Sequence, residues 1–229
     1  MESTLLGVSL DPLGDEISKV TCLNVMGDDL AVVNAARVSF AKTSCWHDGD
    51  ELKEQDKKLI NYLAKHKHWT PFSQPQIQFR IKMPIFVARQ WYKHSVGFTR
   101  NEGSRRYIST EPQCYTPFWW RVAAKEVKQG SDGSAPPISD SAARETAATA
   151  VSLYRELIWR GVCPEMARMI LPQSMYTEFV EVGSLAAYAR LYSLRSSKEA
   201  QKEVRLYAEA VGSVMQELFP VSWEALTNG

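Results

Sequence analysis

Several features that define common classes of protein are missing from this sequence. Its 229 residues include four cysteines that lie far apart and form no C-x-x-C pair, so we expect neither disulfides nor a zinc site. No apolar run approaches the roughly 18 residues that a transmembrane helix needs. The start Met-Glu-Ser-Thr lacks the basic and apolar regions of a signal peptide. We therefore expect reduced thiols, a cytoplasmic location and no contact with a membrane.

The sequence also lacks the motifs of several cofactor sites. It contains no G-x-G-x-x-G, so a Rossmann-type site for a flavin or NAD is not supported. Its histidines show no H-x-x-x-H or carboxylate spacing, so we expect no metal. The formal net charge is only +1, so no global field attracts nucleic acid. Any anion must therefore be bound by a local cluster of charge.

Apolar periodicity predicts a helix-rich chain of the α/β or α+β class. Side chains three or four positions apart predict helices over roughly residues 28–40, 49–67, 85–94, 139–160, 165–171, 184–196 and 198–219. Residues 76–83 alternate between apolar and polar instead, which predicts a half-buried strand, and residues 175–182 are rich in β-formers. The Gly, Ser and Pro residues of 128–140 predict an exposed loop. We expect a single domain over residues 1–229.

One segment concentrates positive charge. Residues 89–107 hold five Lys or Arg residues, one histidine and a single acid, Glu102, together with aromatic and amide side chains. Guanidinium groups bind phosphate through two parallel hydrogen bonds, and the aromatic residues offer faces for a base or a flavin ring. From these residues alone three interpretations stay open: a solvated basic helix end, a site for an anionic ligand, or a nucleic-acid-binding surface.

This segment resembles the signature of the flavin-dependent thymidylate synthases, the ThyX family, usually written R-H-R-x7–8-S. Lys93-His94-Ser95 stands at R-H-R, and eight residues separate it from Ser104. Further blocks resemble family blocks and follow in the family's order: Val25 to Leu30, Ala35 to Phe40, His66 to Phe72, Pro84 to Trp91, Ala167 to Pro172, and Leu194-Arg195 with Ala200-Gln201. Six collinear blocks are far more specific than one motif.

The resemblance implies a fold and an activity. The fold would be helix-rich with a small, mostly antiparallel sheet, assembled as a homotetramer whose active sites are shared between subunits. The activity would be that of a methyltransferase that converts dUMP to dTMP. NADPH would reduce a tightly bound FAD, and 5,10-methylenetetrahydrofolate would donate the carbon and leave as tetrahydrofolate. The alternatives are a related FAD- and folate-dependent enzyme that modifies C5 of another pyrimidine nucleotide, an inactive homologue and, more distantly, a nucleic-acid-binding protein.

The resemblance also implies roles for individual residues. Arg195 would be catalytic, because a fixed cation beside the uracil favours loss of the N3 proton and makes C5 more nucleophilic. The residues expected to bind dUMP are Gln90, Trp91, Tyr92, Lys93, Glu102, Gly103, Ser104, Arg105, Arg106, Arg168 and Arg195. Those expected to bind FAD are Ser39, His68, Thr70, Lys93, His94, Ser95, Glu102, Ser184 and Arg190. Without the resemblance, most of these would be read as ordinary surface residues.

The chain departs from the family pattern at three places. Ser95 removes one guanidinium of R-H-R, and we expect Arg100 to supply the missing charge. Glu199 stands where many relatives have a histidine near the flavin adenine, and Ser73-Gln74 stands where Glu-His is common. These departures predict weaker binding of flavin, while the proposed role of Arg195 is untouched.

Overall fold

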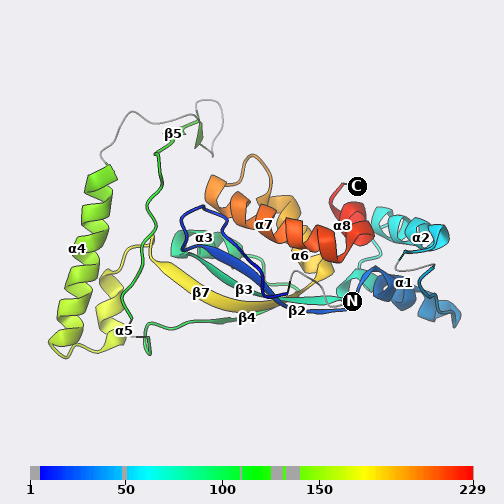
Figure 1. Cartoon of the computed structure of the whole chain (residues 1–229), viewed down its shortest axis with the longest axis horizontal. Coiled ribbons are helices and arrows are strands. Elements are labelled where there is room, and N and C mark those ends of the chain that lie inside the picture. Colours follow the sequence, from blue (N-terminus) through cyan, green and yellow to red (C-terminus); the bar gives the residue numbers. More distant parts are fainter. Residues whose placement is uncertain (1–5, 48–50, 109, 125–130, 133–139, 229) are drawn as a thin grey trace.

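A five-stranded antiparallel sheet runs through the middle of the molecule (Figure 1). The computed structural model describes residues 6–47, 51–108, 110–124, 131–132 and 140–228. The strands lie in the order β1-β2-β3-β7-β4, with every neighbouring pair antiparallel. Their bounds are Ser9–Leu10 for β1, Lys19–Met26 for β2, Gln76–Pro84 for β3, Phe98–Glu102 for β4 and Tyr176–Ser184 for β7. The expected small antiparallel sheet in a helix-rich chain is confirmed.

The helices cover one face of the sheet and extend beyond both of its ends (Figure 1). The bounds are Asp29–Arg37 for α1, Glu54–Lys65 for α2, Ile85–Trp91 for α3, Asp140–Trp159 for α4, Pro164–Ala167 for α5, Leu185–Arg195 for α6, Lys202–Leu218 for α7 and Pro220–Thr227 for α8. Short 3-10 turns follow α1, precede β3 and follow α5, at Val38–Phe40, Pro71–Ser73 and Arg168–Ile170. Helices α1 and α2 lie at one end of the molecule, and α4 and α5 lie at the other.

The core forms where the alternating strand meets the apolar faces of α6 and α7. Ile77, Phe79, Ile81 and Met83 of β3 are completely buried, as their alternation predicts. The face of α7 that carries Val204, Tyr207, Val211 and Met215 is buried against them in the same hydrophobic cluster. The predicted strand and this predicted helix are therefore confirmed, with the start of the helix moved to residue 202.

Several elements were not expected from the sequence, among them β2, β4 and α8. Helix α8 begins at Pro220, where the buried carboxylate of Asp29 accepts hydrogen bonds from the backbone N–H groups of Val221 and Ser222 at 2.8 and 2.9 Å. This N-terminal cap comes from a residue far away in the sequence, so no local pattern could indicate it.

The expected loop over residues 128–140 falls mostly outside the described residues. Within it, Ser131–Asp132 form strand β6, which pairs with Val122–Ala123 of β5, and Asp140 begins α4. Among the described residues, no helix is long and apolar enough to cross a bilayer. No three His, Cys, Asp or Glu side chains of the described part gather as metal ligands would.

Candidate active site

Strand β4 separates the predicted nucleotide-binding residues into two groups. Gln90, Lys93 and His94 precede β4, on α3 and the turn after it, whereas Glu102 ends β4 and leads into Ser104. Strand β4 runs along β7 from the pair Phe98–Gly183 to the pair Glu102–Phe179. At about 3.3 Å of rise per residue, the two ends of β4 lie roughly 13 Å apart.

The first group centres on Arg195, the last residue of α6. Its Nε donates to Nε2 of His94 at 2.9 Å, and its Nη2 donates to the backbone carbonyl of Gln90 at 3.1 Å. Two contacts at different nitrogens fix the orientation of the planar guanidinium. Since a guanidinium has five N–H donors, three remain to face a ligand.

His94 accepts the hydrogen bond from Arg195 because it is neutral. Burial of the ring, followed by the charges of Arg195, Arg100 and Arg190, lowers the pKa of His94 from 6.5 to about 4. With Nε2 accepting from Arg195, the single ring proton is assigned to Nδ1. The histidine therefore positions Arg195 without opposing its charge.

A chain of polar side chains extends this group toward α7. Nε2 of Gln90 donates to Oε1 of Gln201 at 2.6 Å, and Gln201 donates in turn to Glu203 at 2.9 Å. Glu203 also forms an ion pair with Arg121 at 2.8 Å. No local sequence pattern indicates Glu203 or Arg121, because their contacts depend on how α7 packs beside α3. The chain holds Gln90 in place and leaves its Oε1 atom outside these contacts.

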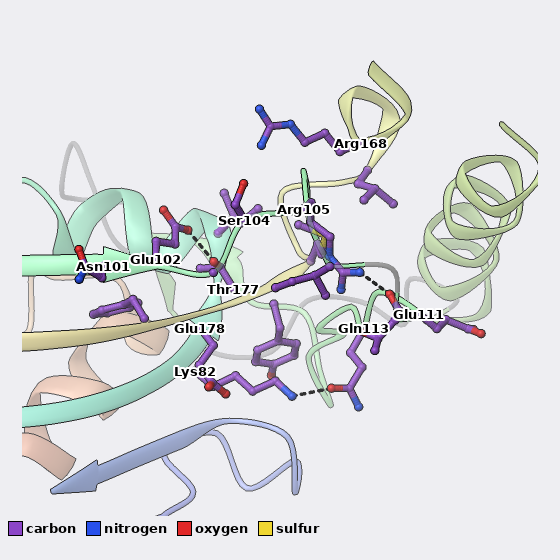
Figure 2. A pocket seen from close by; sticks show the side chains of 18 of the residues that line it. Lys82, Asn101, Glu102, Ser104, Arg105, Glu111, Gln113, Arg168, Thr177 and Glu178 are labelled. Atoms are coloured by element: carbon purple, nitrogen blue, oxygen red, sulfur yellow. Dashed lines mark hydrogen bonds between the residues drawn. The ribbon is translucent and has the colours of Figure 1, made fainter. Parts of the chain in front are cut away.

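The second group lines a cavity of about 820 Å³ at the other end of β4 (Figure 2). The lining includes five residues that the resemblance assigns to the nucleotide site: Glu102, Gly103, Ser104, Arg105 and Arg168. They come from the end of β4, the turn that follows it, and the 3-10 turn after α5. We call this cavity the β4 pocket.

Charges in the β4 pocket are only partly neutralised. The carboxylate of Glu102 accepts from Oγ1 of Thr177 at 2.5 Å, and Arg105 donates to the carbonyl of Thr110. The exposed Arg168 has no ion-pair partner among the described residues. In the view of Figure 2 its side chain lies above Ser104. The pocket therefore offers guanidinium donors that suit an anionic group such as phosphate.

Arg106 lies beside this pocket but outside its lining. Its Nη2 forms an ion pair with Glu165 at 3.1 Å, with both side chains about half exposed. A pair this exposed contributes little stability, so the guanidinium of Arg106 is available to a ligand at small cost.

The structure corrects the predictions for Trp91 and Arg100. Trp91 is completely buried, and its indole N–H donates to the buried carboxylate of Glu181 at 3.2 Å, so Trp91 packs the core and offers no surface to a nucleotide. Arg100 stands directly opposite Glu181 in the β4–β7 pairing and forms an ion pair with it. Its guanidinium lies 4.7 Å from the Phe98 ring centre. The expectation that Arg100 replaces the charge missing at Ser95 is therefore wrong.

Tyr92 caps the end of α3 and is half-buried, with its ring packed edge-to-face on Phe179 at 5.1 Å. Ser184, predicted to bind FAD, is also largely committed to the fold. It is buried, and its Oγ accepts from the N–H of Ala187 at 3.2 Å as the N-terminal cap of α6. Both residues hold the elements around the site, and only Tyr92 keeps some exposed surface.

The remaining residues predicted to bind FAD lie in two places. Ser39, His68 and Thr70 are exposed at the α1–α2 end of the molecule. Lys93 and Ser95 are exposed beside His94, and Arg190 reaches the same segment by donating to the carbonyl of Val96 at 2.6 Å. The structure of one chain therefore brings the second set together with Arg195 but leaves the first set apart.

Comparisons with known proteins show which proteins this chain resembles. The family model described as thymidylate synthase complementing protein matches residues 21–221. The chain is 39% identical over 210 residues to a flavin-dependent thymidylate synthase of Thermus thermophilus, covering 90% of this chain and 74% of that protein. It is 36% identical over 211 residues to the enzyme of the same name from Thermosipho africanus, covering 89% and 88%.

A solved structure shows the same fold. The UMP/dUMP methylase PolB from Streptomyces cacaoi, bound with 5-Br dUMP, matches with a TM-score of 0.80 and 29% sequence identity. The match covers 92% of this chain and 95% of the methylase. The arrangement of sheet and helices is therefore shared with a protein that holds a pyrimidine nucleotide.

Proposed function

Because the chain belongs to the flavin-dependent thymidylate synthase family, we propose that it methylates dUMP at C5 and that Arg195 activates the uracil ring. The observation that carries this proposal is the pair of hydrogen bonds that orient Arg195, one to neutral His94 and one to the Gln90 carbonyl. A cation fixed in this way stabilises negative charge as the ring loses its N3 proton. The resulting electron density at C5 makes that carbon the nucleophile.

FAD reduced by NADPH would supply the hydride, and methylenetetrahydrofolate would supply the carbon. The residues of this chain suit the flavin nucleotide chemically, because exposed Lys93 and Arg190 offer cationic donors for its phosphates. His68, Thr70 and Ser39 offer further hydrogen-bonding groups, but at the α1–α2 end of the molecule. A complete flavin site therefore calls for residues from more than one copy of the chain.

The β4 pocket would bind the sugar–phosphate part of the nucleotide. Arg105, Arg106 and Arg168 would neutralise the phosphate, and Ser104 would donate a hydrogen bond. The Oγ of Ser104 accepts from the N–H of Arg106 at 3.3 Å, and no base contacts this hydroxyl among the described residues. A role in binding therefore suits Ser104 better than one as a nucleophile.

Shared sites in a homotetramer would explain the apolar residues exposed around both groups. Val96 follows His94 by two positions and is 71% exposed, and Leu194, which precedes Arg195, is 63% exposed. Tyr107 and Met169, next to Arg106 and Arg168, are 81% and 75% exposed. Apolar side chains beside charged ligand-binding groups are typical of surfaces that another protein chain covers.

The proposal is tested by incubating the purified protein with FAD, NADPH, methylenetetrahydrofolate and dUMP labelled with tritium at C5. We expect NADPH-dependent release of tritium and formation of dTMP. Since the Streptomyces methylase is described as acting on UMP as well as dUMP, UMP is tested in parallel, and faster turnover of UMP would favour the alternative activity. Absence of turnover with both nucleotides would refute the proposed function.

A further inference from the structure

A buried carboxylate on helix α7 stands at the end of the polar chain that reaches Gln90. Glu203 is 4% exposed and lies in the first turn of the helix. Nη2 of Arg121 lies 2.8 Å from its Oε1 and donates to its Oε2 at 2.9 Å. Nε of Arg121 donates to Oγ of Ser131 at 2.6 Å, which fixes the arginine in turn. The arginine therefore balances the buried charge, and Glu203 acts only as a hydrogen-bond acceptor.

This restriction passes along the chain of side chains. Because Glu203 only accepts, the carboxamide of Gln201 must turn its Nε2 toward it, and this nitrogen donates to Oε2 of Glu203 at 2.9 Å. Gln201 therefore presents its Oε1 to Gln90, which can meet that oxygen only with its own Nε2, at 2.6 Å. The two ends of a carboxamide are nearly alike in shape, so the hydrogen-bond network decides which way Gln90 points.

The same orientation leaves one end of the Gln90 side chain without a partner. A second contact of its Nε2, to the Phe86 carbonyl at 3.5 Å, stays within helix α3. No donor of the described residues contacts its Oε1. The backbone carbonyl of the same residue accepts from Arg195. An unused acceptor therefore lies on the residue whose backbone orients the guanidinium that we propose to be catalytic.

We infer that Glu203 is a positioning residue of the nucleotide site, which acts through Gln201 to present Gln90 as an acceptor to the nucleoside part of dUMP. The inference rests on the proposed function, because it presumes that Gln90 binds dUMP. The nucleoside offers hydrogen-bond donors, at the uracil N3–H and the sugar hydroxyl, whereas an ionised phosphate offers only acceptors. A side chain held as an acceptor therefore suits the nucleoside and not the phosphate.

The test exchanges the positions of the carboxylate and the carboxamide. Glu203→Gln keeps the size of the side chain but can both donate and accept, so the orientation of Gln90 is no longer fixed. The dissociation constant of dUMP, measured by equilibrium dialysis of the full-length protein supplied with FAD, is expected to rise about fivefold. Adding Gln201→Glu places an acceptor-only group directly against Nε2 of Gln90, so the double variant is expected to bind dUMP within about twofold of the parent.

Kinetics separate positioning from a purely structural role. The backbone carbonyl of Gln90 orients Arg195 independently of the side chain, so Glu203→Gln is expected to raise the KM for dUMP and to leave kcat within about twofold of the parent. If Glu203 only tied Arg121 to α7, the melting temperature and kcat would fall while KM stayed unchanged. Deoxyuridine, competing against labelled dUMP, is expected to lose affinity by the same factor as dUMP.

Two further variants guard against damage to the fold. Gln201→Met removes the intermediate side chain at an exposed position without a change of charge, so it is expected to weaken dUMP binding as Glu203→Gln does. Glu209→Gln makes the same chemical change on the same helix, at a carboxylate that lies 3.6 Å from Arg205. Its affinity for dUMP is expected to equal that of the parent.

The outcomes distinguish this inference from the proposed function. Unchanged dUMP affinity in Glu203→Gln and Gln201→Met, in protein that still methylates dUMP, would overturn the inference alone. Failure of Gln201→Glu to rescue Glu203→Gln would also overturn it, and so would a loss that spares deoxyuridine, because Gln90 would then contact the phosphate. If the parent neither bound nor methylated dUMP, the proposed function and the inference would fall together.

Discussion

At the scale of single residues, the hydrogen bond that Arg195 donates to His94 explains why a histidine suits this position. A protonated imidazole would face three arginines, so burial and these charges together keep His94 neutral. Neutral imidazole can accept a hydrogen bond and thereby orient the cation that it contacts. The positive charge is in this way concentrated on Arg195, where it can stabilise an anionic ring.

Replacement of Arg195 separates its chemical role from its structural one. Arg195→Ala is expected to lower turnover about 10²- to 10³-fold, as removal of one charge-stabilising donor typically does, while the circular dichroism spectrum stays unchanged. Arg195→Lys is expected to recover little, because an ammonium cannot hold both contacts and also bind the ring. Reduction of FAD by NADPH should persist in both variants, and tritium release near the parent rate would contradict the assignment.

Protonation of His94 makes stability depend on pH. The folded pKa of about 4 lies below the ordinary histidine pKa of 6.5, so between these values the unfolded chain binds a proton that the folded chain excludes. The contribution of His94 to stability is therefore complete above pH 6.5 and is lost as the pH falls toward 4. We expect His94→Gln, which keeps a hydrogen-bond acceptor, to show a smaller fall in melting temperature than the parent between pH 7 and pH 4.5.

The exposed His66 provides the matched control for this measurement. His66→Gln should follow the parent across the same range of pH. A fall in the melting temperature of His94→Gln as large as that of the parent would show that His94 does not carry the effect.

Single residues also show the limit of sequence reasoning. Arg100 follows Ser95 by five positions and was the natural candidate for the missing charge, yet the pairing of β4 with β7 turns it toward Glu181. Arg190 is distant in sequence but adjacent in space, because α6 packs on residues 96 and 97. Motif resemblance identified both groups of residues around β4, whereas their individual contacts depend on tertiary packing.

At the scale of elements, an ion pair fastens β4 to β7. Glu181 is completely buried and contacts both Arg100 and the indole N–H of Trp91. Burial of the carboxylate, the largest influence on it, raises the pKa of Glu181 above its usual value, and the charge of Arg100 opposes that rise. Strand β4 connects the two halves of the site, and this ion pair holds it to β7. Removal of either partner would leave the other as an uncompensated buried charge.

Breaking this pair should destabilise the fold without weakening the flavin site. Arg100→Met leaves a buried carboxylate without its partner, so a loss of about 3 kcal/mol in stability is expected. Adding Glu181→Gln removes the uncompensated charge and keeps an acceptor for Trp91, so part of the loss should be recovered. Denaturant unfolding measures both effects, and FAD affinity measured alongside should stay near that of the parent.

If Arg100→Met were as stable as the parent, the Arg100–Glu181 pair would contribute nothing net to the stability of the fold. A large loss of FAD affinity in Arg100→Met, with stability unchanged, would instead support the expectation that Arg100 supplies the charge missing at Ser95.

The elements that sequence predicted share one property, which is a regular pattern of burial within a few residues. Strand β3 alternates because one of its faces is wholly buried, and α7 shows helical spacing because one stripe packs into the core. Strand β4 is an edge strand without a buried, alternating face, and α8 depends on a cap from Asp29. Such elements are defined by their partners, so a local pattern cannot indicate them.

At the scale of the whole molecule, the residues that we propose to bind nucleotide and flavin lie at separate places. Arg195 and Arg190 lie near the start of β4, the β4 pocket lies at its end, and His68 lies with α2 at one end of the molecule. Exposed apolar side chains flank the first two of these places. Association of several copies would cover this apolar surface and bring the complementary parts together.

Mixing of inactive variants tests whether sites are shared between copies. Arg195→Ala and Arg168→Ala remove one residue from each group, so each variant alone is expected to be inactive. If one chain contributes Arg195 and a neighbouring chain contributes Arg168, random co-assembly at equal amounts leaves about one quarter of the sites with both arginines intact. Tritium release from the co-refolded mixture should then approach about a quarter of the parent rate.

The control is a mixture in which the same chain carries both substitutions and is combined with Arg195→Ala. No site of that assembly can contain an intact Arg195, so its activity should stay at the level of Arg195→Ala alone. If the mixture of single variants were equally inactive after verified co-assembly, both arginines would have to come from one chain. The nucleotide would then span β4 within a single subunit, and the exposed apolar residues would need another explanation.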